Sequence, residues 1–159
     1  EIATAVNRAT GEFDYLLAAA TCDYFEGAVV ALLTGPGKYT LFAPTDAAFE
    51  NLQRALGVTT PSPEITCSLD QAYLFDVLAY HVTEGRRFSN SVFGKRSVKM
   101  IEMLNDQYVV TSPNLTISDN VGQTIGIQRD PGTGRPIANI NASNGVIHVI
   151  DTVLLPSLP

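Results

Sequence analysis

The feature of this sequence that most constrains its fold is a change of hydrophobic spacing near Met100. Before it, apolar residues recur every three or four positions, as in helices that bury one face. After it, short β-branched runs alternate with turn residues, which is typical of strands. One apolar run in the first part, Tyr39–Ala43, is ended by Pro44 and indicates an early buried strand. Helices first and strands second predict an α+β domain.

The 159 residues fit one domain, so we expect a single domain over residues 1–159. Helices are expected around 13–33 with a break at Thr21–Asp23, from Thr45 as a cap to Leu56, and from a capping box at Ser68–Gln71 to Leu78. Strands are expected at 39–43, 100–104, 108–111, 115–118, 121–128, 137–141 and 146–155. Asn144-Gly145 is a strong signal for a hairpin turn between the last two.

The net charge limits the classes of partner that the chain is expected to bind. Lys and Arg number 10 and Asp and Glu number 16, which gives a net charge of −6 at pH 7. An acidic, sparsely charged chain is a poor partner for phosphate backbones or anionic membranes, so no nucleic-acid binding is expected. No apolar run approaches the roughly 18 residues that a membrane span needs, so no transmembrane segment is expected in this chain.

Two cysteines and two glycosylation sequons bear on the compartment. Cys22 and Cys67 can be unrelated buried thiols or a disulfide. The sequons at Asn114 and Asn141, each weak alone, together with the even cysteine count favour a secreted protein with one disulfide. Closing that loop would contribute about 4 kcal/mol in the chain-entropy model.

The inventory of reactive groups argues against an enzyme. His81 and His148 lie 67 positions apart, outside any metal-ligand spacing, and each is expected to be a structural histidine. No G-x-S-x-G elbow or calcium-loop spacing is present, so no metal site and no required cofactor are expected. Asp46 and Asp151 are the conceivable carboxylate pair, but a cap and a strand-end role suit them better.

Three segments carry a resemblance to a known family. The run from Tyr39 to Phe49 and the run from Asn144 to Pro156 resemble the two signature motifs of fasciclin (FAS1) domains, and Val77–Val82 is similar to the family's Tyr-His motif. The resemblance implies a β-sheet wedge of about seven strands with packed helices. It also implies a secreted or cell-surface protein that binds matrix or cell-surface proteins or glycans, with Tyr80 and His81 as the partner-contact residues. No Arg-Gly-Asp sequence is present.

Two functions from different classes follow. The first is a non-enzymatic adhesion or interaction domain, as the family resemblance implies. The second is a water-soluble carrier of an apolar small molecule, because the chain also resembles algal fasciclin-like proteins that bind carotenoids such as astaxanthin under stress. Such a carrier needs an apolar slot between helix and sheet with a few polar groups at its ends.

Candidate residues for that slot come from both parts of the chain. Met100 and Met103 stand among polar neighbours, and methionine often lines adaptable apolar grooves. Ile137 shares a predicted strand face with Asn139 and Asn141, which points outward if Asn141 is glycosylated. The alternative for each is a residue at the edge of the core. The full set of predicted ligand-binding residues is Tyr15, Leu16, Leu17, Met100, Met103 and Ile137.

Overall fold

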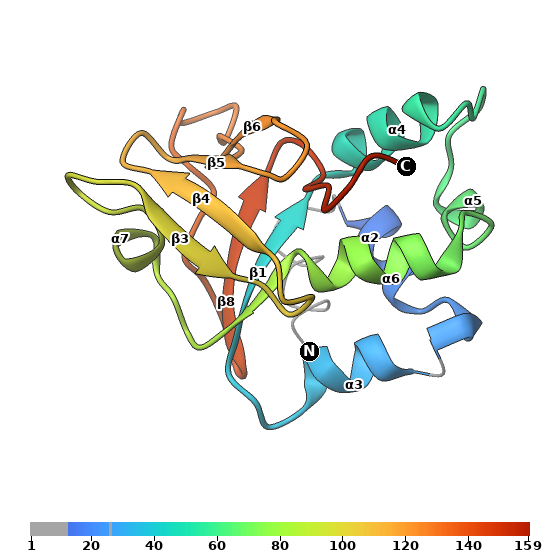
Figure 1. Ribbon diagram of the computed structural model, residues 1–159, viewed down its shortest axis with the longest axis horizontal. Coiled ribbons are helices and arrows are strands. Elements are labelled where there is room, and N and C mark those ends of the chain that lie inside the picture. Colours follow the sequence, from blue (N-terminus) through green and yellow to red (C-terminus); the bar gives the residue numbers. More distant parts are fainter. Residues whose placement is uncertain (1–12, 26) are drawn as a thin grey trace.

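The computed structural model describes residues 13–25 and 27–159, and its helices and sheets gather at opposite ends (Figure 1). At the helical end lie α2 (Asp14–Ala20), the 3₁₀ turn η1 (Asp23–Phe25), α3 (Ala28–Thr34), α4 (Asp46–Ala55), α5 (Pro63–Thr66) and α6 (Gln71–Ala79). The four-residue α7 (Ser89–Val92) lies beside the sheets at the far end. The strands are β1 (Tyr39–Pro44), β2 (Val82–Glu84), β3 (Lys99–Glu102), β4 (Tyr108–Ser112), β5 (Thr116–Ser118), β6 (Thr124–Gly126), β7 (Ile140–Ala142) and β8 (Gly145–Ile150).

These strands form two four-stranded sheets. The first has the order β2-β1-β8-β7 and the second the order β3-β4-β5-β6. The strands β1 and β8 pair in parallel along their whole length, from Tyr39 opposite Gly145 to Pro44 opposite Ile150. Both signature segments thus lie side by side at the centre of one sheet. The α+β class is confirmed, with eight described strands where the sequence predicted seven.

The first sheet is buried on both faces, and this places the layers. Along β1, Leu41 and Ala43 belong to the apolar cluster shared with the helices, whereas Phe42 belongs to the cluster shared with the second sheet. Every residue of β8 is buried. The first sheet therefore lies between the helices and the second sheet. Continuous apolar runs, rather than alternating ones, are typical of strands in this position.

The strand that the sequence analysis missed is β2. It has three residues, Val82–Glu84, and pairs antiparallel with Tyr39–Leu41 of β1. It follows α6 with only Tyr80 and His81 between them, so its single apolar residue continues the helical spacing and gives no separate signal. β2 therefore connects the end of α6 to the edge of the first sheet.

Two predicted local signals are corrected by the structure. The residue that caps α6 is Asp70, whose carboxylate accepts from the Tyr73 amide at 2.8 Å, and not Ser68. The hairpin between β7 and β8 is present, but Ala142 pairs with Gly145, so the turn residues are Ser143 and Asn144. In both cases the predicted motif is present, but it lies one or two residues away from its predicted position.

The two cysteines form a disulfide, which confirms the prediction of a bridge. Cys22 follows α2 and Cys67 follows α5, and their Cα atoms are 5.5 Å apart across 45 positions of sequence. The bridge ties together two helices of the helical end. In the part of the chain that the structure describes, no helix is both long and apolar enough to cross a membrane.

Candidate functional site

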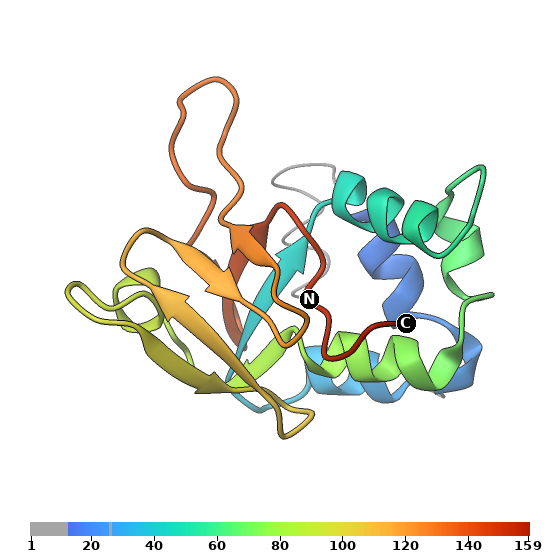
Figure 2. The same ribbon diagram turned by 45° about the horizontal axis from the view of Figure 1, so that its top comes forward.

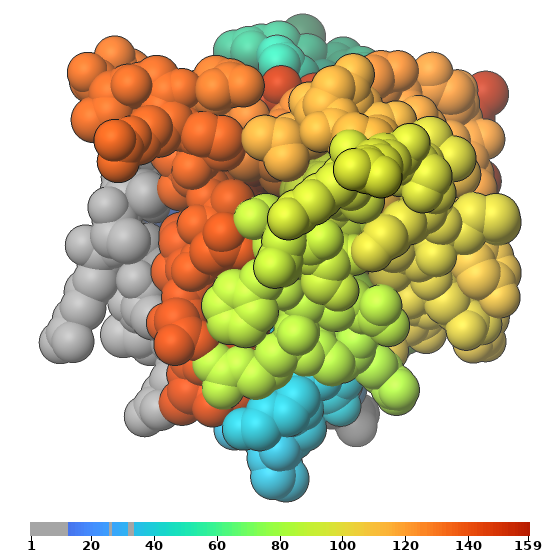
Figure 3. All heavy atoms as spheres, turned by 90° about the vertical axis from the view of Figure 1, so that its left-hand side faces the viewer, coloured from blue at the N-terminus to red at the C-terminus, as the bar shows by residue number. Residues whose placement is uncertain are grey.

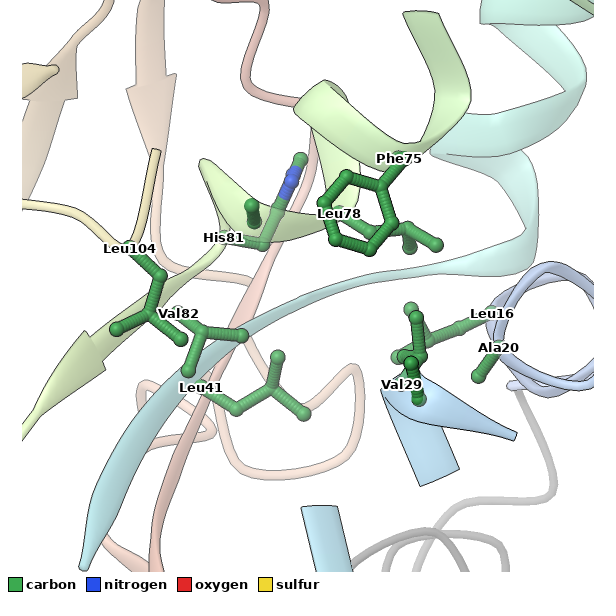
Figure 4. A pocket seen from close by; sticks show the side chains of 11 residues that line it. Leu16, Ala20, Val29, Leu41, Phe75, Leu78, His81, Val82 and Leu104 are labelled. Carbon is green, nitrogen blue, oxygen red and sulfur yellow. The ribbon is translucent and has the colours of Figure 1, made fainter. Parts of the chain in front are cut away.

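An apolar cavity of about 300 Å³ lies between the helical end and the first sheet. Helices α2, α3 and α6 form one side of it, and β1, β2 and the residue Leu104 form the other (Figure 4). In this view Val82 and Leu104 lie on one flank and Leu16, Ala20 and Val29 on the opposite flank. The lining residues are Leu16, Ala20, Ala28, Val29, Leu41, Phe75, Leu78, Ala79, His81, Val82 and Leu104.

The chemistry of this lining is that of a hydrocarbon site. His81 is the one residue of the lining set with a polar side chain, and both of its ring nitrogens have partners. Its Nδ1 donates to the Val77 carbonyl at 2.6 Å, and its Nε2 accepts from the Leu154 amide at 3.0 Å. His81 therefore has no ring nitrogen left for a ligand. The cavity can hold an apolar group by burial and shape alone.

The Tyr-His segment is built into the core. The side chain of Tyr80 is fully buried, and its hydroxyl donates to the Tyr108 carbonyl at 2.7 Å. Burial, reinforced by the negative charge of Asp119, raises the pKa of Tyr80 to about 12. His81 is 1% exposed, and burial lowers its pKa to about 4. Neither of the two predicted partner-contact side chains is presented at the surface in this structure.

His148 also has a structural position, in the centre of β8. Its Nδ1 accepts from the Asn139 amide at 3.3 Å, and its Nε2 donates to the Arg87 carbonyl at 2.8 Å. The Phe42 ring packs 5.7 Å from its ring centre, and burial lowers the pKa of His148. The imidazole thus links two loops across the sheet, which fits the expected structural role.

The two candidate carboxylates hold backbone amides at separate places. Asp46 accepts from the Tyr15 amide at 3.1 Å and joins α4 to α2. Asp151 accepts from the Gly126 amide at 3.2 Å, just beyond the end of β8. Within the described residues, no group of three or more His, Cys, Asp or Glu side chains could hold a metal ion.

Of the six predicted ligand-binding residues, Leu16 lines the cavity. Tyr15 is buried in the helical cluster, where its ring stacks on Phe49, while Leu17 is 37% exposed on α2. Met100 and Met103 are not brought together: Met100 is 69% exposed on β3, whereas Met103 is buried between the sheets. Alternation along an extended chain separates them, because three positions place two side chains on opposite faces.

Ile137 does not lie on an outward strand face, contrary to the prediction. Strand β7 begins only at Ile140, and Asn139 has a φ of 60°, so strand alternation does not extend back to Ile137. Ile137 is half-buried and packs against the helical cluster. It does not belong to the residues that line the cavity.

The two sequon asparagines are both exposed, in different settings. Asn114 lies in the turn between β4 and β5, where its side-chain oxygen accepts from the Thr116 hydroxyl at 2.8 Å. Asn141 lies in β7, and its side-chain oxygen accepts from the Arg86 guanidinium. Both positions are accessible for a glycan, whose attachment stays a prediction.

Sequence reasoning missed most of the cavity lining, including Phe75, Leu78 and Leu104. One feature of the sequence could have indicated part of this lining. Helix α6 carries Phe75 in addition to the buried Leu74, Val77 and Leu78, so its apolar residues extend beyond one face. A helix with such a wide apolar surface packs against more than one neighbour or leaves a surface uncovered. Phe75 is 46% exposed and lies at the cavity.

The fold and the cavity define a class of α+β domain in which most side chains of the motifs are buried. A family model for the fasciclin domain matches residues 20–156. The chain therefore belongs to the fasciclin domain family.

Individual proteins that the chain resembles are consistent with this family. The chain is 29% identical over 130 residues to protein sll1483 of Synechocystis, covering 82% of this chain and 62% of that protein. It is 27% identical over 121 residues to the cell surface glycolipoprotein MPB83 of Mycobacterium bovis, covering 76% of this chain and 44% of that protein. A pair of FAS1 domains from the insect cell adhesion molecule fasciclin I matches with a TM-score of 0.53 and 16% identity, over 86% of this chain and 45% of that one. The chain thus spans less than two thirds of the length of each of these relatives.

Proposed function

We propose that this chain is a non-catalytic binding domain of the cell surface or extracellular matrix, which contacts proteins or glycans through its exposed surface. The observation that carries the proposal is the use of the motif side chains. Thr45, Tyr80, His81 and His148 are all buried and hydrogen-bonded to the backbone. These four side chains are therefore not presented to a partner, and binding falls to exposed residues elsewhere on the surface.

Two further findings support an extracellular location. The disulfide between Cys22 and Cys67 is of a kind that persists in oxidising compartments. The relatives include a protein named for the cell surface and a cell adhesion molecule. Both sequons are exposed, as glycosylated asparagines in a secreted protein would be.

The test is adhesion of beads coated with the purified, disulfide-bonded chain to cells of the organism that makes it. Beads that carry the chain should resist detachment by flow better than beads that carry an unrelated acidic protein of similar size. Equal detachment of the two kinds of bead, with the chain shown to be folded by its circular dichroism, contradicts the proposal.

The apolar cavity favours a second candidate, a carrier of an apolar small molecule of the carotenoid type, such as astaxanthin. Its volume of about 300 Å³ lies at the lower end of the range for small-molecule sites, which runs from roughly 300 to 1,000 Å³. That volume suits one end ring of a long polyene, with the rest of the molecule lying along the surface. Burial of the ring against Phe75 and Leu78 would supply the affinity.

A cavity-filling substitution tests this candidate. Ala79→Leu places a larger side chain in the cavity lining and should lower the astaxanthin retained per protein by roughly tenfold or more, since even one methylene matters in a fitted apolar pocket. Ala55→Leu, at an exposed alanine of α4 outside the cavity lining, is the matched control and should bind as the wild type does. The readout is the visible absorption of the protein after gel filtration.

Two results contradict the carrier. One is a wild-type chain that stays colourless after reconstitution. The other is equal loss of pigment in the Ala79 and Ala55 variants.

A further inference from the structure

One segment of this acidic chain carries only positive charge. Residues 86–99 contain Arg86, Arg87, Lys95, Arg96 and Lys99 and no Asp or Glu. Arg87 is half-buried and the other four are exposed. Half of the ten Lys and Arg residues of the chain thus fall in 14 positions, although its net charge is −6. Such a concentration produces a local positive potential on a negatively charged molecule.

The fold gathers these cations on one face. Lys38 joins them from the turn before β1, because its carbonyl accepts from the Gly85 amide at 2.7 Å. Lys99 of β3 reaches across to α7, where its ammonium donates to the Ser91 carbonyl at 2.8 Å. Figure 3 shows this side of the molecule, with the segment around α7 in yellow-green at the centre and the turn before β1 in blue below it. We call Lys38, Arg86, Arg87, Lys95, Arg96 and Lys99 the basic face.

No ion pair formed by the described residues involves the basic face, although Glu84 and Glu102 line one pocket with Arg87. The ion pair found among the described residues joins Arg54 to Glu50 on α4, at the other end of the molecule. The partners of Arg86, Arg87 and Lys99 are carbonyl and amide oxygens, which fix the side chains without cancelling their charge. Arg86, Arg87 and Lys99 are thus held in place without an ion pair, so they can bind an external anion at a reduced entropic cost.

We propose that the basic face binds an acidic polysaccharide, a carbohydrate chain that carries repeated carboxylate or sulfate groups. The inference rests on the proposed extracellular function and names the class of partner. The cations are spread over three neighbouring segments, so they match charges repeated along an extended chain better than a single small anion. Phe88, 41% exposed beside Arg87, adds an apolar surface for the carbon faces of sugar rings.

The same geometry disfavours a membrane as the partner. Peripheral binding to lipid typically uses an amphipathic helix that lies in the interface. The helix on this face, α7, has four residues, and its apolar Val92 is buried. The exposed Met100 lies on a strand instead. The basic face therefore offers charge without an inserting helix.

The experiment measures binding of the disulfide-bonded chain to immobilised dextran sulfate and polygalacturonate, with uncharged dextran as the reference. Salt is varied from about 50 to 200 mM, because binding to a polyanion releases its counterions and weakens as salt rises. The chain should bind both acidic polymers and not dextran. Lys95→Ala/Arg96→Ala should weaken binding roughly tenfold at low salt and make its logarithmic salt dependence shallower by about one to two.

Arg54→Glu is the matched control. Like the double variant, it lowers the net charge by two, but it lies on α4, which Figure 2 shows in teal at the opposite end of the molecule from α7 in yellow-green. Its binding should stay within about twofold of the wild type, because charges beyond about a Debye length contribute little. Both variants change exposed side chains, and thermal unfolding checks that they are folded.

Four results overturn the inference. These are no binding of the wild type to either acidic polymer, equal binding to uncharged dextran, equal losses in the two variants, and binding to phosphatidylserine vesicles or DNA without binding to the acidic polymers. The bead assay distinguishes failure of this inference from failure of the proposed adhesion function on which it rests. Beads that adhere while the acidic polymers fail to bind contradict the basic face alone, whereas polymer binding without bead adhesion contradicts the adhesion function.

Discussion

At the scale of single residues, His81 shows why a motif histidine need not be catalytic. Its two nitrogens face a carbonyl acceptor and an amide donor, a pairing that only the neutral ring with its proton on Nδ1 can satisfy. A proton added at Nε2 would point at the Leu154 amide. Burial lowers the pKa of the ring to about 4, although the hydrogen bond to the Val77 carbonyl and the charge of Asp119 raise it.

This residue makes stability depend on pH. The folded pKa of about 4 lies below the unfolded value near 6.5, so the unfolded chain binds the proton first as pH falls. The contribution is complete above pH 6.5 and is lost towards pH 4, by about 3 kcal/mol at about 1.4 kcal/mol per pKa unit. Urea unfolding at a series of pH values measures this loss of the free energy of unfolding.

His81→Gln provides the comparison. It should unfold more easily at pH 7 and lose less stability between pH 6.5 and 4 than the wild type does. A smaller slope should remain, because burial also lowers the pKa of His148. Parallel pH profiles for the wild type and the variant would falsify the assignment of this dependence to His81.

At the scale of elements, the junction between β1 and α4 explains the first signature motif. Strand β1 ends at Pro44, and the Thr45 hydroxyl accepts from the Ala48 amide at 3.2 Å to cap α4. The Thr45 amide donates to the Ile150 carbonyl, so the same residue joins the helix start to the end of β8. Both signature segments meet at this point.

Removing the cap tests that explanation. Thr45→Ala should lower the free energy of unfolding by about 1–2 kcal/mol, because one helix amide loses its acceptor and the site is buried. Thr45→Ser keeps the hydroxyl and should recover most of the loss. Urea unfolding at pH 7 compares the three proteins. Equal losses in the Ala and Ser variants would mean that packing of the methyl group, and not capping, fixes this junction.

The elements also show how much of the fold could be predicted from the sequence. Long periodic segments and the Thr45 cap were predictable because their signals are local. The strand β2 and the position of the β7–β8 turn were not, because three residues give no period and pairing with a neighbour decides the register. The cavity was harder still. Its lining joins Leu16, Phe75 and Leu104, which are distant in sequence and are brought together only by packing.

At the scale of the whole molecule, the helical end and the sheets are held together by different interactions. Extended pairing holds the strands of each sheet together, whereas the helices have no such ladder. The apolar cavity lies where the helices meet the first sheet, so packing there is incomplete. The disulfide is located at the helical end.

The disulfide should therefore contribute much of the stability of the molecule. It closes a loop across 45 positions that includes α3, β1 and α4, and restricting the unfolded chain by that amount is worth about 4 kcal/mol. Cys22→Ser/Cys67→Ser should lower the free energy of unfolding by roughly this value, measured by urea unfolding. Wild type in a reducing agent should lose a similar amount. Because Ala20, two positions before Cys22, lines the cavity, any astaxanthin retention should fall as well. A double variant as stable as the wild type would show that helix packing alone holds this end, and that the bridge reports the compartment without supporting the fold.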